Sequence, residues 1–138
     1  MRRWILVAIA VVLGRWLTVE NDERDQVTRL LRAQLAGDEE AMLAALDETC
    51  RHRPACVGTV RANADRLRGP GELEIVAYDS STAYAIGSGS GPTRVVWKTA
   101  DRLTTVQCVG VEREGSILAG TSVSLTGLSA PIEREGAC

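Results

Sequence analysis

The hydrophobic period of the chain changes once, at Gly69-Pro70-Gly71. Before this point, apolar residues recur at helical spacing over residues 25–36, from Asp38 to about residue 49, and over about residues 57–67. After it, apolar and polar residues alternate, which is typical of half-buried strands. Helices followed by strands with short connections predict an α+β domain with an antiparallel sheet.

About five strands are expected in the second half. Their approximate ranges are 72–78, 82–87, 93–99, 102–112 and 116–125. Asp79-Ser80-Ser81 is expected to form a tight turn, Gly87 to Pro92 a flexible loop, and Gly127 to Cys138 an irregular tail. One sheet face must pack on the two to three helices, because their apolar stripes have no other partner. The predicted core contains Leu31, Leu35, Leu43, Leu46, Val60, Leu67, Ile75, Trp97, Val109 and Val123.

The first nineteen residues have the pattern of an export segment. Met1-Arg2-Arg3 precedes ten apolar residues, Trp4 to Leu13, and acidic residues follow Val19. The apolar run gives about 15 Å of helix, and residues 4–19 give about 24 Å. Residues 1–19 therefore predict a signal peptide or a short membrane anchor, ahead of a domain over 20–138. A retained anchor with the domain outside is preferred to secretion, because no typical cleavage site follows the run. A buried helix of the fold is the alternative.

The four cysteines indicate an oxidising compartment. An even number in an exported domain predicts two disulfides, and we expect Cys50–Cys56 and Cys108–Cys138. The turn at Pro54 brings the first pair together, and the second pair tethers the tail; the two crossed pairings are the alternatives. Five residues separate Cys50 from Cys56, and His52 is the one histidine, so the pattern argues against a zinc site. No metal or cofactor is expected.

Charge is distributed unevenly along the chain. The formal net charge is −2, and residues 20–138 contain 13 basic and 18 acidic side chains, so nucleic acid is not an expected partner. One segment is basic, with Asp65 as its one acid. Its arginines are Arg51, Arg53, Arg61, Arg66 and Arg68. These five residues predict either a solvated helix face or a contact with anions, such as lipid headgroups or an acidic envelope polymer.

A short motif resembles a known superfamily. In Leu30-Leu31-Arg32-Ala33-Gln34-Leu35-Ala36-Gly37-Asp38-Glu39-Glu40-Ala41-Met42-Leu43, one helix ends in Gly-Asp and the next begins with a leucine stripe. This arrangement resembles the nuclear-transport-factor-2-like superfamily, and in particular its exported actinobacterial members. Residues 106–109 and 128–132 add to the resemblance, which covers about residues 24–132. It implies a cystatin-like α+β cone with a curved antiparallel sheet.

The same resemblance implies where a ligand would bind. Enzymes of the superfamily place acids and aromatic residues inside the concave sheet, and the matching positions here are Tyr78, Asp79, Tyr84 and Trp97. Asp79 could act there as a general base, although a turn aspartate and two cross-strand tyrosines are the simpler interpretation. No catalytic residue is assigned.

We therefore expect a non-enzymatic extracytoplasmic domain that binds a small ligand or a protein partner in the envelope. The membrane would be a second partner through residues 4–19, and homodimerisation stays open. The alternative is a small lyase or isomerase that uses an acid in the sheet cavity. A sheet interior filled with side chains would favour the binding module, and an open cavity with an inward acid would favour the enzyme.

Overall fold

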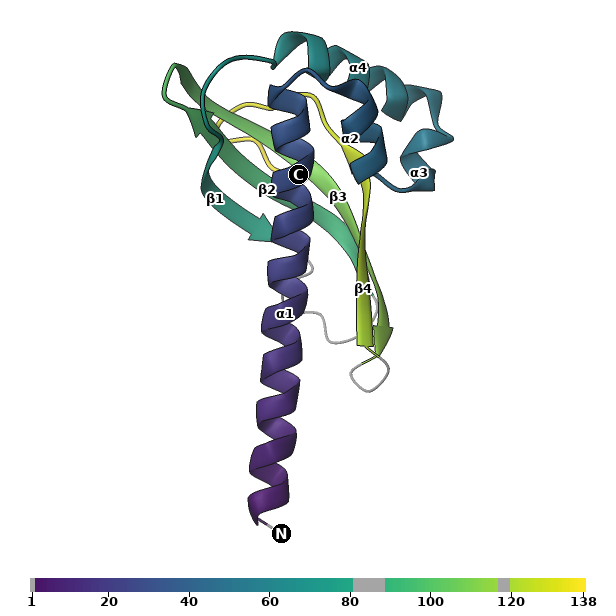
Figure 1. Ribbon diagram of the computed structural model, residues 1–138, viewed down its shortest axis with the longest axis vertical. Helices are drawn as coiled ribbons and strands as arrows, with labels where there is room; N and C mark the ends of the chain where they lie inside the picture. Colours follow the sequence, from purple (N-terminus) through teal and green to yellow (C-terminus); the bar gives the residue numbers. More distant parts are fainter. Residues whose placement is uncertain (1, 81–88, 117–119) are drawn as a thin grey trace.

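The computed structural model describes residues 2–80, 89–116 and 120–138 and has an α+β architecture (Figure 1). Helices come first, and an antiparallel sheet with strand order β1-β2-β3-β4 follows. The elements are α1 (Arg2–Leu35), α2 (Glu39–Ala45), α3 (Glu48–Arg51), α4 (Pro54–Arg66), β1 (Glu74–Ser80), β2 (Gly89–Thr99), β3 (Arg102–Ser116) and β4 (Gly120–Leu128). The order of helices before strands confirms the expected fold class.

Helix α1 runs along the longest dimension of the molecule. Its 34 residues continue without a break from the N-terminal apolar stretch into the segment expected to be helical over 25–36. In Figure 1 the C-terminal half of α1 lies across one face of the sheet, while the N-terminal half extends beyond it. Among the described residues, no helix combines the length and the apolar character needed to cross a membrane.

The helix expected from Asp38 to about residue 49 is two helices. Leu46 leaves the helical conformation after α2, and Asp47 begins α3 by accepting a hydrogen bond from Thr49 N at 3.0 Å. The break is stabilised by the sheet, because Asp47 N donates to Leu125 O at 2.8 Å. Helix α4 begins at Pro54, three residues earlier than expected. Proline is favoured at the first position of a helix, because the N–H groups of the first turn have no partner within the helix and proline has no N–H.

The sheet differs from the expected five-strand meander. β1 pairs directly with β2, so Asp79 lies within β1 opposite Arg94 and not in a turn. Gly89 to Pro92 belong to β2, where they pair with Gly110 to Arg113 of β3, and not to a flexible loop. β3 continues to Ser116, and the next strand begins at Gly120, not at 116. The strand expected over 82–87 lies outside the described residues.

The helices and the sheet share one core, as expected. Of the predicted core, Leu43, Ile75 and Val123 are partly buried and pack against it. The other predicted core residues are buried, namely Leu31, Leu35, Leu46, Val60, Leu67, Trp97 and Val109.

The tail is held on the sheet by covalent and polar contacts. The disulfides are Cys50–Cys56 and Cys108–Cys138, the pairing that the sequence predicts. β4 runs to Leu128, so the irregular tail begins at Ser129, whose N–H donates to Cys108 O at 2.8 Å. Further along, Arg94 Nε donates to Gly136 O at 2.9 Å. The C-terminal residues are therefore fixed against β2 and β3.

Candidate functional site

A buried carboxylate lies between α1 and the sheet. The Glu23 side chain is fully buried and forms an ion pair with Arg113, whose guanidinium nitrogen lies 2.7 Å from Glu23 Oε2. Three hydroxyls donate to its other oxygen: Thr93 at 2.7 Å, Tyr78 at 2.8 Å and Ser80 at 3.0 Å. Glu23 therefore joins α1 to β1, β2 and β3 through one carboxylate.

The partners of Glu23 decide its protonation state. Burial raises its pKa, but the hydrogen bonds from Arg113, Thr93, Tyr78 and Ser80 outweigh burial and hold the pKa below 4.5. Burial and the neighbouring carboxylate raise the pKa of Tyr78. A general base for catalysis near neutral pH needs a raised pKa and a free lone pair facing a substrate. The geometry of Glu23 fits a structural ion pair better.

A second polar cluster fills the sheet interior nearer the C-terminal end of α1. The side-chain amides of Gln34 and Gln107 exchange two hydrogen bonds, at 2.8 and 2.9 Å. Trp97 Nε1 donates to Gln107 Oε1 at 2.8 Å, and Gln107 Nε2 also donates to Ser129 O at 3.0 Å. Gln34, Trp97 and Gln107 are all fully buried. The described part of the interior is therefore occupied by packed and hydrogen-bonded side chains.

Of the expected cavity residues that the structure describes, Tyr78 and Trp97 lie on one side of the sheet and Asp79 on the other. Tyr78 and Trp97 face α1, but Asp79 is exposed on the opposite side of β1, because successive residues of a strand point to opposite faces. Tyr84 lies outside the described residues. The inward acid is Glu23, which the sequence analysis did not single out. Its spacing to Val27 and Leu30 on one helix face was the available signal.

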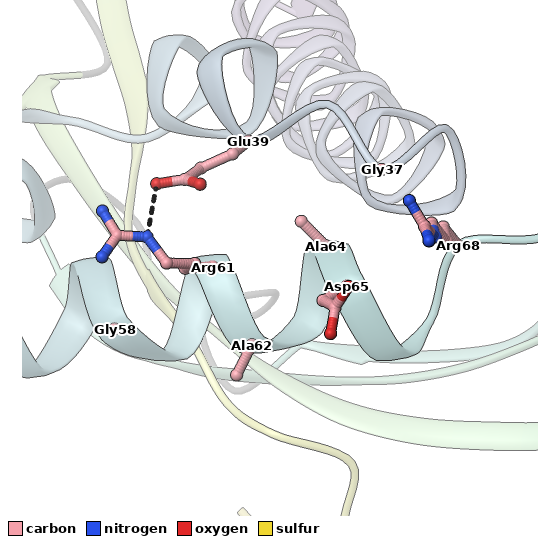
Figure 2. Close-up of a pocket in the computed structure, with 8 residues that line it drawn as sticks. All are labelled: Gly37, Glu39, Gly58, Arg61, Ala62, Ala64, Asp65 and Arg68. Carbon is pink, nitrogen blue, oxygen red and sulfur yellow. Dashed lines mark hydrogen bonds and ion pairs between the residues drawn. The ribbon is translucent and has the colours of Figure 1, made fainter.

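The described residues contain a surface pocket of about 530 Å³ between α4 and the α1–α2 turn. Its lining residues are Gly37, Glu39, Gly58, Arg61, Ala62, Ala64, Asp65 and Arg68 (Figure 2). Gly37 has φ +68° and packs closely on α4, since a Cβ at this position would lie 3.3 Å from Ala64 O. Gly58 has no atom within 4 Å of the place of a Cβ, so the α4 backbone is accessible there.

Two arginines of the basic segment face this pocket. Arg61 Nε lies 3.2 Å from Glu39 Oε1, and the Arg61 side chain is 70% exposed. Figure 2 shows Arg61 joined to Glu39 through Nε, with Arg68 at the other end of the pocket. The structure thus brings Arg61 and Arg68 to one site. The remaining arginines, Arg51, Arg53 and Arg66, are exposed around α3 and α4.

In the described part of the chain, no three His, Cys, Asp or Glu side chains lie close enough together to hold a metal ion. Comparisons with protein-family models, with curated proteins and with solved structures find no match to this chain. The candidate site therefore has to be interpreted from its own geometry.

Proposed function

We propose that this chain is an exported, non-catalytic binding module of the cell envelope, built on a nuclear-transport-factor-2-like domain. The observation that carries this proposal is the filled face of the sheet. Where a related enzyme would need an open cavity, Trp97, Gln107 and Gln34 are buried and hydrogen-bonded to one another. The inward acid, Glu23, is fully engaged with Arg113 and three hydroxyls.

The location rests on the disulfides and the N-terminal pattern. Two disulfides are consistent with an extracytoplasmic protein, because such bonds persist in oxidising compartments. Arg2-Arg3 and the run from Trp4 to Leu13 would direct export. We propose that the run is retained and contacts the membrane. The side chains of Trp4, Ile5 and Leu6 are 80%, 59% and 67% exposed, so membrane contact would remove apolar surface from water.

The binding site of the module would be the pocket beside α4. It is open at the surface, and it combines cationic and anionic side chains with an accessible stretch of helix backbone at Gly58. A ligand or partner in the envelope would bind there without entering the sheet.

Hydrogen exchange at the Trp97 indole tests the filled interior. The full chain in neutral detergent micelles has three tryptophans, and the Trp97 indole N–H resonance is assigned by its loss in Trp97→Phe. We expect this proton to exchange only through global unfolding, because it is buried and donates to Gln107. Exchange as fast as in the urea-unfolded chain would mean an interior open to water, and the lyase or isomerase alternative would then be preferred.

A reporter that is active only outside the cytoplasm, fused after Cys138, tests the location. We expect an active reporter and an intact N-terminal run by mass spectrometry. A silent reporter would contradict export, and a mature N-terminus beyond residue 14 would contradict retention.

A further inference from the structure

The shape of the molecule places the pocket far from the N-terminal run. Gly69 N donates to Leu35 O at 3.0 Å, so the end of α4 lies beside the end of α1. Figure 1 shows α2, α3 and α4 at the end of the molecule opposite the N-terminus. Leu13 and Leu35 of α1 are 22 residue steps apart, which corresponds to about 33 Å at 1.5 Å per step. Electrostatic attraction in salt decays over about 8–10 Å. If the run is held in a membrane, as proposed above, the headgroups of that membrane are out of reach of Arg61 and Arg68.

The segment of residues 51–68 is basic, whereas the rest of the domain is acidic. Residues 51–68 hold five arginines and one acid, whereas the rest of residues 20–138 holds 8 basic and 17 acidic side chains. Among the described residues, Arg61 is the one arginine of the segment that forms an ion pair. Glu39 and Asp65 line the same pocket, so the five arginines exceed these two acids by three, and a polyanion would be attracted to this surface and repelled by the rest of the domain.

The surface also lacks the apolar anchors of a typical protein interface. Stable protein interfaces bury aromatic or aliphatic side chains at their centre. The exposed large apolar side chains of the described residues are Trp4, Ile5, Leu6, Val7, Ile9, Val76 and Leu103, none of which lies in α2, α3 or α4. A surface that is charged and has no exposed large apolar side chains is expected to bind a hydrophilic partner.

We propose that the pocket and the exposed arginines of residues 51–68 bind a hydrophilic anionic polymer of the envelope. Arg61 and Arg68 would receive its acidic groups, because a guanidinium presents paired donors that match phosphate and carboxylate oxygens. Glu39 accepts from Arg61 Nε, and the two terminal nitrogens of Arg61 would donate to the ligand. At Gly58 the absence of a side chain leaves room for the polymer to approach the helix backbone.

The test uses the full chain in neutral detergent micelles and fluorescently labelled long-chain inorganic polyphosphate, followed by anisotropy. The variant is Arg61→Gln/Arg68→Gln. The control, Arg29→Gln/Arg134→Gln, removes the same charge from exposed arginines outside the segment. We expect affinity to fall about tenfold or more in the variant and less than about twofold in the control, with the slope of log affinity against log salt reduced by about 1.5. Both proteins should melt like the wild type, because surface charges contribute little to stability.

Two results would overturn the inference. Equal weakening in variant and control would mean that only net charge matters. Stronger binding to anionic phospholipid vesicles than to polyphosphate, with the same dependence on Arg61 and Arg68, would make lipid the ligand. Neither result alters Trp97 exchange or the location of the reporter, so failure here is distinguishable from failure of the proposed function.

Discussion

Replacing Glu23 by glutamine tests whether the buried ion pair organises the fold. The substitution keeps the volume of the side chain but removes the charge that Arg113 faces at 2.7 Å, and it turns an amide donor toward donors. Both side chains are at most 2% exposed, so water cannot replace the lost partner. Breaking a buried ion pair by removing one partner costs about 3–5 kcal/mol. That is a large share of a typical stability of about 5–15 kcal/mol.

Urea unfolding followed by circular dichroism measures this loss, with Glu72→Gln as the control because Glu72 is exposed in the loop before β1. The control should change stability by less than about 0.5 kcal/mol. For a chain of this size, the Glu23→Gln loss corresponds to a melting temperature lower by roughly 10–20 °C. A loss no larger than that of Glu72→Gln would refute the buried ion pair.

The same residue predicts a pH dependence with a defined sign. The folded pKa of Glu23 is below the 4.5 of an unperturbed glutamate, so its contribution is fully present above pH 4.5. The contribution is lost as the pH falls through the folded pKa. Wild-type stability should therefore approach that of Glu23→Gln in acid, and a constant difference down to acid unfolding would contradict the lowered pKa.

Three single substitutions test the packing, and two paired serine variants test the covalent links. Leu31→Ala should cost about 2–5 kcal/mol in urea unfolding, because Leu31 is fully buried between α1 and the sheet, and an unchanged midpoint would contradict that packing. Gly110→Ala should destabilise by about 1–3 kcal/mol, because its Cβ would lie 2.4 Å from Thr126 Oγ1. Gly58→Ala, with no atom within 4 Å, should stabilise α4 by about 0.5–1 kcal/mol, and the opposite order of the two glycine variants would refute this reasoning. In the chain-entropy model, loss of Cys108–Cys138 should cost about 3.7 kcal/mol against about 2.4 kcal/mol for Cys50–Cys56, as paired serine variants would show in thermal melts.

Local patterns predicted the elements whose cause is local. The change of period at Gly69-Pro70-Gly71 and the leucine stripes indicated helices before strands. The Gly37-Asp38 break was equally visible, since glycine adopts φ +68° there and Asp38 accepts a hydrogen bond from Ala41 N. The disulfide pairing was predicted because Pro54 turns the chain between Cys50 and Cys56 and because the tail needs a tether. The helix boundaries depend on residues close in sequence, and four cysteines allow few alternative pairings.

Features with a distant cause were missed. Asp79-Ser80 has the composition of a turn, but pairing with Arg94 and Thr93 extends β1 through it. The helix expected to about residue 49 breaks at Leu46 because Asp47 N finds Leu125 O in β4. In both cases the backbone pairs with a strand that is distant in sequence, and the conformational preferences of the neighbouring residues do not predict such pairing.

By itself, the sequence determined the order of helices before strands, the apolar stripes of the helical segments and the basic character of residues 51–68, and it favoured the disulfide pairing that the structure has. Only the tertiary structure decided that Glu23 meets Arg113 across 90 residues, that Asp79 faces away from α1, and that Arg61 and Arg68 share a pocket. The physical reason is range. Helix periodicity, turn chemistry and charge composition are properties of neighbouring residues. A buried ion pair or a surface pocket exists only once strand register and helix packing have brought distant residues together.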